Sequence, residues 1–300
     1  MEIAAELKDI DQALGRIAPG RDWAALLNSV TGDASLAPLH ELKAAVQKSG
    51  VDCQGDAFER LLLAYAMAES EPRIDGLPVH ASVKPLIRRE FKRFTDVRPS
   101  GPALLLGADP FVAAAKICTL RRFPAGPMDW VISGVPRSWF TKMPPARLLP
   151  ALRYIYFEFG GRGPAFYVHL AHPPRNRSLV LEIEVRKSWY RMAASLALQP
   201  EVRGIACASW FHDPRAMEDA PHLASLNEPY LAAGGRIVTT LGEAPAESGF
   251  LKFSPERRAR YQRGELKLMT TLAMWPRKAA LDWAARHPEL EDAHLPLSRG

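Results

Sequence analysis

The chain has 300 residues and a formal net charge of +6, from 39 Lys and Arg against 33 Asp and Glu. Its hydrophobic content of 47% and charged content of 24% are those of a globular protein and exclude a disordered or collagen-like chain. The longest apolar runs are too short to cross a bilayer, so no membrane span is expected. The three cysteines, Cys53, Cys118 and Cys207, imply no disulfide framework, and the expected compartment is the cytoplasm of a bacterium.

The basic residues gather in two segments, 83–94 and 254–264. Neither segment carries a known DNA- or RNA-binding motif, and basic helices are commonly solvated faces. We therefore expect a small-molecule partner rather than nucleic acid.

The first hundred residues predict helices. Apolar side chains recur at helical spacing in 3–14, 36–46 and 58–66, and a basic helix is expected from about Pro85 to Phe94. The segment 96–102 has the Pro, Gly and Ser content of a linker. These patterns predict a helical N-terminal domain over 1–98, then a connecting segment and a helix over 99–120 that opens at Asp109-Pro110.

From residue 121 the pattern changes to alternating strands and helices. Strands are predicted at 128–134, 165–171, 203–211, 236–241 and 266–275, and 137–143 is predicted to be a further strand or the second arm of a hairpin. Helices are predicted from Pro145, at 183–198, 221–235 and 254–264, and after Pro276. The segment 203–211 is too apolar to face water, so it is expected to be central.

The predicted fold class is α+β. A helical N-terminal region is followed, over 121–287, by a mixed β-sheet covered by helices, and a loose C-terminal tail is expected over 288–300.

The stretch ACASWFHDPR ends the expected central strand in side chains that can do chemistry. Ligands usually lie beyond the carboxyl ends of such strands, so Ser209, His212 and Asp213 are candidates for a site. His169 and His172 end the preceding strand, and together these histidines and Asp213 could ligate zinc or non-haem iron. Their spacing matches no known metal signature. Hydrogen-bonded histidines with an Asx-type turn at Asp213 explain them better, and we expect no metal.

Ser209 could act as a nucleophile with a histidine base. It lacks the glycine-flanked elbow that exposes the serine of hydrolases, so a serine hydrolase is not expected. The turn GGRGP at 160–164 could hold a phosphate through backbone amides, although it opens no helix. The chain contains no Walker or dinucleotide motif, which disfavours ATP and NAD as ligands.

Arginines surround the loop after the strand at 165–171 and the helix that follows it; they are Arg175, Arg177, Arg186 and Arg191. Guanidinium groups at a helix N-terminus favour the binding of a pyrophosphate. Glu182 and Glu184 lie in the same turn, so a helix with solvated ion pairs explains these arginines equally well.

The order of elements over about 170 of the 300 residues is similar to that of the GNAT-type acetyltransferases, which bind acyl-CoA. SLNEPYLAAGGRIV resembles the helix and strand of that family in which an asparagine is followed by a tyrosine and a Y-x-x-x-G pattern, here Asn227, Tyr230 and Gly234. In the family, pantetheine lies in the gap between a strand and its splayed neighbour, and amides at the start of the next helix hold the pyrophosphate. The resemblance implies that the strand at 165–171 splays from that at 203–211.

The resemblance further implies an N-acyltransferase with acyl-CoA as co-substrate and an amine or amino-acid-like acceptor. Tyr230 would be the general acid that reprotonates the CoA thiolate, and His169, or a water that it holds, would be the base that deprotonates the amine. The further catalytic candidates are Ser209 and His212, and the candidates for binding CoA are Arg175, Arg177, Arg186 and Asn227.

Two alternatives remain open. One is a metal-dependent enzyme that uses His169, His172, His212 and Asp213. The other is a non-catalytic binding or partner protein on the same scaffold, because fold similarity alone implies no activity. The acyl group, the acceptor and the oligomeric state do not follow from the sequence.

Overall fold

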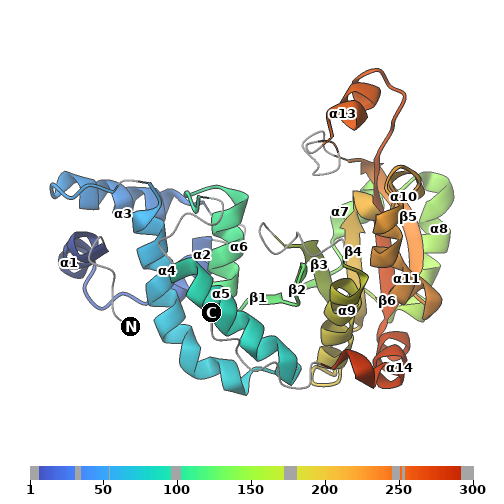
Figure 1. Cartoon of the computed structure of the whole chain (residues 1–300), viewed down its shortest axis with the longest axis horizontal. Helices are drawn as coiled ribbons and strands as arrows, with labels where there is room; N and C mark the ends of the chain where they lie inside the picture. The colour runs from blue at the N-terminus through green and yellow to red at the C-terminus, as the bar shows by residue number, and fades with distance from the viewer. Residues whose placement is uncertain are drawn as a thin grey trace. The chain divides into compact units, whose positions relative to one another are not determined.

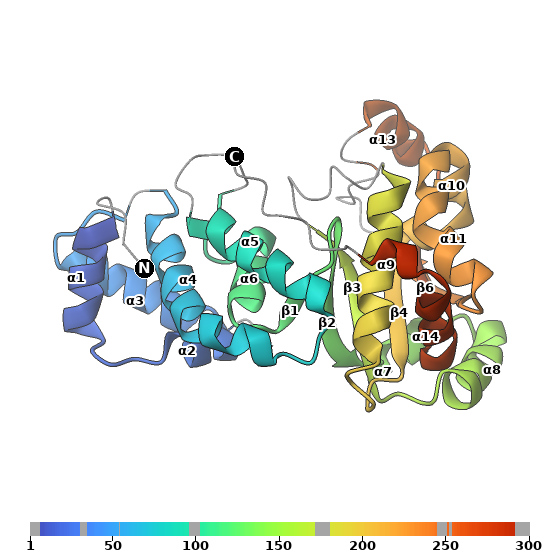
Figure 2. The same cartoon turned by 60° about the horizontal axis from the view of Figure 1, so that its bottom comes forward.

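A computed structural model of the chain describes residues 7–30, 35–53, 55–95, 103–171, 181–244, 251 and 254–291. The chain forms two compact units, whose helices and strands are shown in Figures 1 and 2. The first unit comprises Met1–Leu77, Val83–Pro124 and His172–Pro174, and the second comprises Pro78–Ser82, Ala125–Ala171 and Arg175–Gly300. No helix among the described residues is both long enough and apolar enough to cross a membrane.

The first unit is helical, as the sequence predicted. Its elements are α1 (Lys8–Ile17), α2 (Trp23–Val30), α3 (Ala37–Lys48), α4 (Ala57–Ser70), α5 (Lys84–Thr95) and α6 (Asp109–Cys118), then the short strand β1 (Arg122–Pro124). Helix α4 lies at the centre, because it contacts α1, α2, α5 and α6 and buries most of its length. A helix that is apolar around most of its circumference packs in the middle of a bundle.

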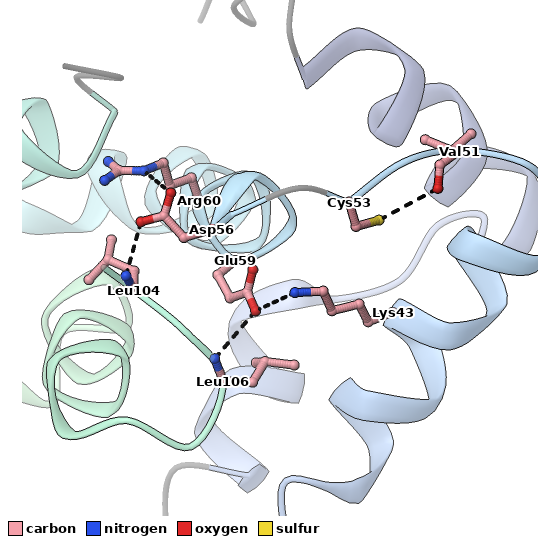
Figure 3. Close-up of polar contacts among 8 residues, drawn as sticks. All are labelled: Lys43, Val51, Cys53, Asp56, Glu59, Arg60, Leu104 and Leu106. Atoms are coloured by element: carbon pink, nitrogen blue, oxygen red, sulfur yellow. Dashed lines mark hydrogen bonds and ion pairs between the residues drawn. The ribbon is translucent and has the colours of Figure 1, made fainter. Parts of the chain in front are cut away.

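Two carboxylates at the start of α4, on its N-cap residue Asp56 and on Glu59, bind the loop that leads to α6 (Figure 3). Glu59 is buried, and its Oε1 accepts hydrogen bonds from Lys43 Nζ at 2.9 Å and from the backbone N–H of Leu106 at 3.3 Å. One turn earlier, Asp56 Oδ2 accepts a hydrogen bond from the backbone N–H of Leu104 at 2.9 Å. Oε1 of the buried acid is therefore matched by one cation and one backbone donor, whereas Oε2 has no hydrogen-bond partner among the described residues.

The strands form a six-stranded mixed sheet in the order β1-β2-β3-β4-β6-β5. Those of the second unit are β2 (Met128–Gly134), β3 (Pro164–Leu170), β4 (Gly204–Ser209), β5 (Arg236–Glu243) and β6 (Met269–Pro276). β3 and β4 are parallel, whereas the pairs β2–β3, β4–β6 and β5–β6 are antiparallel. The predicted α+β class and the central position of β4 are confirmed.

Helices cover both faces of this sheet. On one face, α7 (Arg137–Lys142), α8 (Pro145–Arg153) and the π-helical turn η4 (Tyr154–Glu158) share a core with Ala206 and Met274. Trp275 points to the opposite face, where its ring lies 6.0 Å from that of Trp189 and 5.4 Å from that of Trp283. That face is covered by α9 (Glu182–Leu196), α11 (Ala224–Ala232) and α14 (Arg277–Arg286). The shorter α10 (Pro214–Asp219) and α13 (Pro255–Gln262) complete the unit.

One predicted strand was wrong. The segment after Pro136 forms helix α7 rather than a second strand, and Trp139 is buried on that helix. A hairpin partner for β2 was not available to this segment, because β1 and β3 occupy the two edges of β2. Alternation of apolar and polar residues over so few positions does not distinguish a strand from a short helix.

Two predicted ends were also wrong. The strand expected to run to residue 211 ends at Ser209, and Trp210–His212 form a 3₁₀ turn (η6) before Asp213 caps α10. The tail was expected to be loose from residue 288, but Pro288–Leu290 form a further 3₁₀ turn (η8) and Leu290 is buried. The linker predicted at 96–102 and the tail from 292 onward lie outside the described residues.

Candidate functional site

The parallel strands β3 and β4 are neighbours, and their pairing is short. It covers Phe166↔Ile205 and Tyr167↔Ala206, whereas β2 and β3 pair along all seven residues of each strand. Beyond these pairs, side chains bridge the two strands. Tyr167 Oη donates to the carbonyl of Ala208 at 3.5 Å. The regular ladder is therefore confined to the first half of these strands, and their carboxyl-terminal halves form the candidate site.

His169 lies on β3 at this end and is half-buried. Its ring contacts that of Tyr167 edge to face, with the centroids 4.8 Å apart. Across the antiparallel pair, His169 stands directly opposite Asp129 of β2, which is fully buried. Directly opposed residues share one face of a sheet with their Cβ atoms about 5 Å apart. Asp129 is a residue that sequence reasoning missed; only the strand register places it beside His169.

A second group of polar side chains is buried beneath the end of β4. His212 of η6, Asn227 and Tyr230 of α11 lie within hydrogen-bond distance of one another, and each is almost fully buried. His212 Nδ1 lies 2.5 Å from Asn227 Oδ1 and 2.9 Å from Tyr230 Oη, and Tyr230 Oη donates to Asn227 Oδ1 at 2.6 Å. We call these three residues the His212 cluster.

The hydrogen bonds of Asn227 fix the tautomer of His212. Asn227 Nδ2 donates to the carbonyl of Phe211 at 3.0 Å and to that of Leu223 at 3.3 Å, so the amide presents its oxygen to the ring. Two acceptors cannot face each other at 2.5 Å, so Nδ1 of His212 carries the proton and donates it. Nε2 is then an acceptor, and it has no hydrogen-bond partner among the described residues.

Burial shifts the acidities of this cluster. Desolvation lowers the pKa of His212 from 6.5 to about 4, although the hydrogen bond to Asn227 opposes the shift. Desolvation, followed by the nearby Cys207, raises the pKa of Tyr230 well above its usual value. Both side chains are therefore neutral near pH 7. A cavity of about 10 Å³, the size of about one water molecule, is lined by His212, Tyr230, Cys207, Trp189 and Trp275 among others.

The structure separates the candidates for nucleophilic chemistry. Tyr167 pairs with Ala206, so His169, two residues on, faces the same side of the sheet as Ala206. Ser209 lies an odd number of residues from Ala206 and faces the opposite side. Ser209 and His169 therefore do not form a nucleophile–base pair.

Asp213 has a structural role. Its Oδ1 accepts a hydrogen bond from the backbone N–H of Arg215 at 3.1 Å, which caps α10, and its Oδ2 accepts one from the N–H of Met269 at 2.7 Å. No group of three His, Cys, Asp or Glu side chains that could hold a metal occurs among the described residues, and the predicted ligand His172 lies outside them. The metal alternative therefore gains no support.

Of the arginines expected near the pyrophosphate, Arg186 is described, whereas Arg175 and Arg177 lie outside the described residues. Arg186 Nη1 lies 3.2 Å from Glu228 Oε2 and 3.8 Å from Glu182 Oε1. Its charge is thus partly neutralised by ion pairs within the second unit. A helix with solvated ion pairs was the alternative to a pyrophosphate site that the sequence had left open.

A separate hollow of about 430 Å³ lies in the first unit, between the end of α4 and α5. Its volume is in the range of small-molecule sites. Its lining combines apolar side chains such as Met67 and Phe91 with Lys92 and Glu71, and Glu71 is paired with Arg88 at 2.9 Å. It brings together no combination of nucleophile, acid and base.

The chain matches no protein-family model, no curated protein and no solved structure. No family is thereby assigned.

Proposed function

We propose that the second unit binds acyl-CoA and transfers the acyl group to an amine. One observation carries the proposal. β3 and β4 are parallel neighbours whose ladder stops after Phe166↔Ile205 and Tyr167↔Ala206, and helix α9 is the next described element after β3. In the GNAT-type acetyltransferases, which the chain resembles, pantetheine lies in a gap between two such strands. The start of the next helix, here α9, would face the pyrophosphate, since helix N-termini favour anions.

In this proposal His169 is the base. It lies at the end of β3 where the ladder has stopped, it is half-buried, and Asp129 stands opposite to orient its ring. The amine nitrogen attacks the thioester carbonyl, His169 accepts a proton from that nitrogen, and the C–S bond breaks to release the CoA thiolate. The carbonyl carbon changes its bond from sulfur to nitrogen, and no oxidant or metal is needed.

The role of Tyr230 as the general acid has less support than the role of His169 as the base. Tyr230 is 2% exposed and its hydroxyl is hydrogen-bonded to Asn227 and lies beside His212, so it reprotonates the thiolate only if the sulfur reaches the interior beside Cys207. The same burial favours the alternative of a non-catalytic binding protein, in which the His212 cluster only holds the end of β4 in place. Tyr230→Phe distinguishes the two roles.

The test is acetyl-CoA binding followed by turnover. Native mass spectrometry and thermal unfolding of the full chain with acetyl-CoA should show one bound molecule and a stabilisation of about 2.7 kcal/mol at a ligand concentration one hundred times Kd. His169→Ala should keep binding and lower acetylation of an amine panel by about 100-fold or more. The exposed His40→Ala is the matched control and should change neither.

The outcomes separate the candidates. A mass and a Tm that ignore acetyl-CoA would refute acyl-CoA binding and leave the binding-protein alternative. Binding without any loss of turnover in His169→Ala would refute the assigned base. A Tyr230→Phe variant with a lower Tm but unchanged turnover would restrict that residue to a structural role.

A further inference from the structure

We propose that the second unit docks on an anionic lipid surface through the exposed side of α8 and η4. This lipid-binding face consists of Leu149, Tyr156 and Phe157 with the flanking Arg147 and Arg153. The proposal is independent of the acyltransferase proposal, because these residues lie on the helices that cover the sheet and not at the ends of β3 and β4.

The apolar side chains of this face are large, and all three lie within the nine residues from 149 to 157. Leu149 is 75% exposed, Tyr156 52% and Phe157 84%. Scattered exposed apolar side chains need no explanation, but a contiguous group of large ones marks an interaction site. In both views α8 lies at the outer edge of the second unit, on the side of β5 (Figures 1 and 2).

The helix geometry places Leu149 and Arg153 on one side of α8, because they are four positions apart. Arg147 is two positions from Leu149 and projects from another side of the same helix. The chain then continues without a break into the π-helical turn η4, in which the N–H of Phe159 donates to the carbonyl of Tyr154 at 3.0 Å. A π turn contains one more residue than an α-helical turn. Tyr154 and Phe159, at its two ends, are both buried, and the rings of Tyr156 and Phe157 between them are exposed to solvent. Single π turns are rare and are frequently found at functional sites.

The exposed charges of α8 and of the preceding helix α7 are positive. They are Arg147 and Arg153 on α8 and Arg137 and Lys142 on α7. None of these four cations has an ion-pair partner within the described part of the chain. The nearby Glu158 already pairs with Arg236 at 3.1 Å. The face therefore combines exposed aromatic and aliphatic side chains with unneutralised cations, the combination that binds the interface of an anionic membrane.

Other occupants fit less well. Single-stranded nucleic acid could stack its bases on the two rings and place its phosphates beside the arginines. It has no apolar group to pack against Leu149, the second most exposed of these side chains. A second copy of the chain would place the same cations against one another across a two-fold interface, and opposed like charges disfavour association. A lipid surface accepts the aliphatic and aromatic groups in its interfacial layer and neutralises the arginines with headgroups.

The proposal is tested by sedimentation of the full chain with vesicles. Phosphatidylcholine–phosphatidylserine vesicles should bind the chain, and pure phosphatidylcholine vesicles should bind it much more weakly. Phe157→Ser combined with Leu149→Ser should weaken vesicle binding at least tenfold. Loss of even one large apolar side chain from the bilayer interface would cause a change of about that size. Arg147→Gln combined with Arg153→Gln should weaken it by about fivefold for each cation removed, and added salt should act in the same direction.

The matched control is Leu198→Ser. Leu198 is also 52% exposed but lies after α9, away from the lipid-binding face, so its replacement should leave vesicle binding unchanged. Because these positions are exposed, the variants should keep the wild-type Tm. A dye on Ala146→Cys, at an exposed position in a chain whose three native cysteines are buried, should brighten on binding if α8 enters the interface.

Three results would overturn the proposal. The first is no sedimentation with anionic vesicles at low salt. The second is equal loss of binding in Leu198→Ser. The third is a chain that self-associates, or that binds an unstructured oligonucleotide, through Phe157 while ignoring vesicles.

Discussion

Acid should destabilise the second unit through His212. The imidazole is fully buried, and desolvation lowers its pKa from 6.5 to about 4. The unfolded chain takes up this proton near pH 6.5, whereas the folded chain resists it. The contribution of His212 to stability is therefore fully present above pH 6.5 and is lost as the pH falls toward 4. The difference between these pKa values corresponds to about 3 kcal/mol of unfolding free energy.

The measurement is urea unfolding at a series of pH values, followed by tryptophan fluorescence. Wild type should lose about 2 kcal/mol more than His212→Gln between about pH 6.5 and about pH 5, because glutamine does not titrate. Carboxylates elsewhere titrate in both proteins, so their effect cancels in the difference. The exposed His40→Gln should keep the wild-type slope.

Parallel pH profiles for wild type and His212→Gln would refute this reasoning, because they would mean that the ring is not held neutral. Should His212→Gln not fold, the wild type supplies the second measurement. The ring resonances of His212 in folded protein should show the neutral form, with the proton on Nδ1, down to about pH 5. A midpoint near 6.5 would contradict the desolvation of the ring.

Two further changes test the packing of each unit. Gly204→Ala would place a Cβ 2.2 Å from the carbonyl oxygen of Trp275 at a φ of +153°, so a loss above about 3 kcal/mol is expected in thermal unfolding. Gly15→Ala, in α1 with nothing within 4 Å, should instead gain about 0.5–1 kcal/mol, and equal effects would contradict the clash. Lys43→Met should cost about 3 kcal/mol at neutral pH by leaving the buried carboxylate of Glu59 without its cation. The loss should be small for Lys43→Arg, which keeps a cation beside Glu59; an equal cost in both variants would show that the lost ion pair is not its cause.

The sequence predicted elements well where local signals are strong. The helix α13 begins as its residues indicate, with Ser254 accepting a hydrogen bond from the N–H of Arg257. The apolar segment of β4 is central because a strand with no polar face must be covered on both sides. The helical character of the first unit followed from apolar spacing alone, although α2 was not predicted.

Local signals failed where a neighbour distant in sequence decides the outcome. The segment of α7 has a strand-like alternation, but β1 and β3 already occupy both edges of β2. The sequence placed Ser209 and His212 together at one strand end as a single group. In the structure η6 turns His212 under β4, to Asn227 and Tyr230, which lie fifteen and eighteen residues further along the chain.

What the sequence by itself determined was the order of the elements and the segments that are buried, since these depend on apolar spacing and on caps within one turn of the chain. The tertiary structure alone decided which strands are neighbours, that the ladder between β3 and β4 stops early, and that Asp129 stands opposite His169. Strand register and hydrogen bonding between distant segments depend on which surfaces can be buried together. A local pattern does not contain that information.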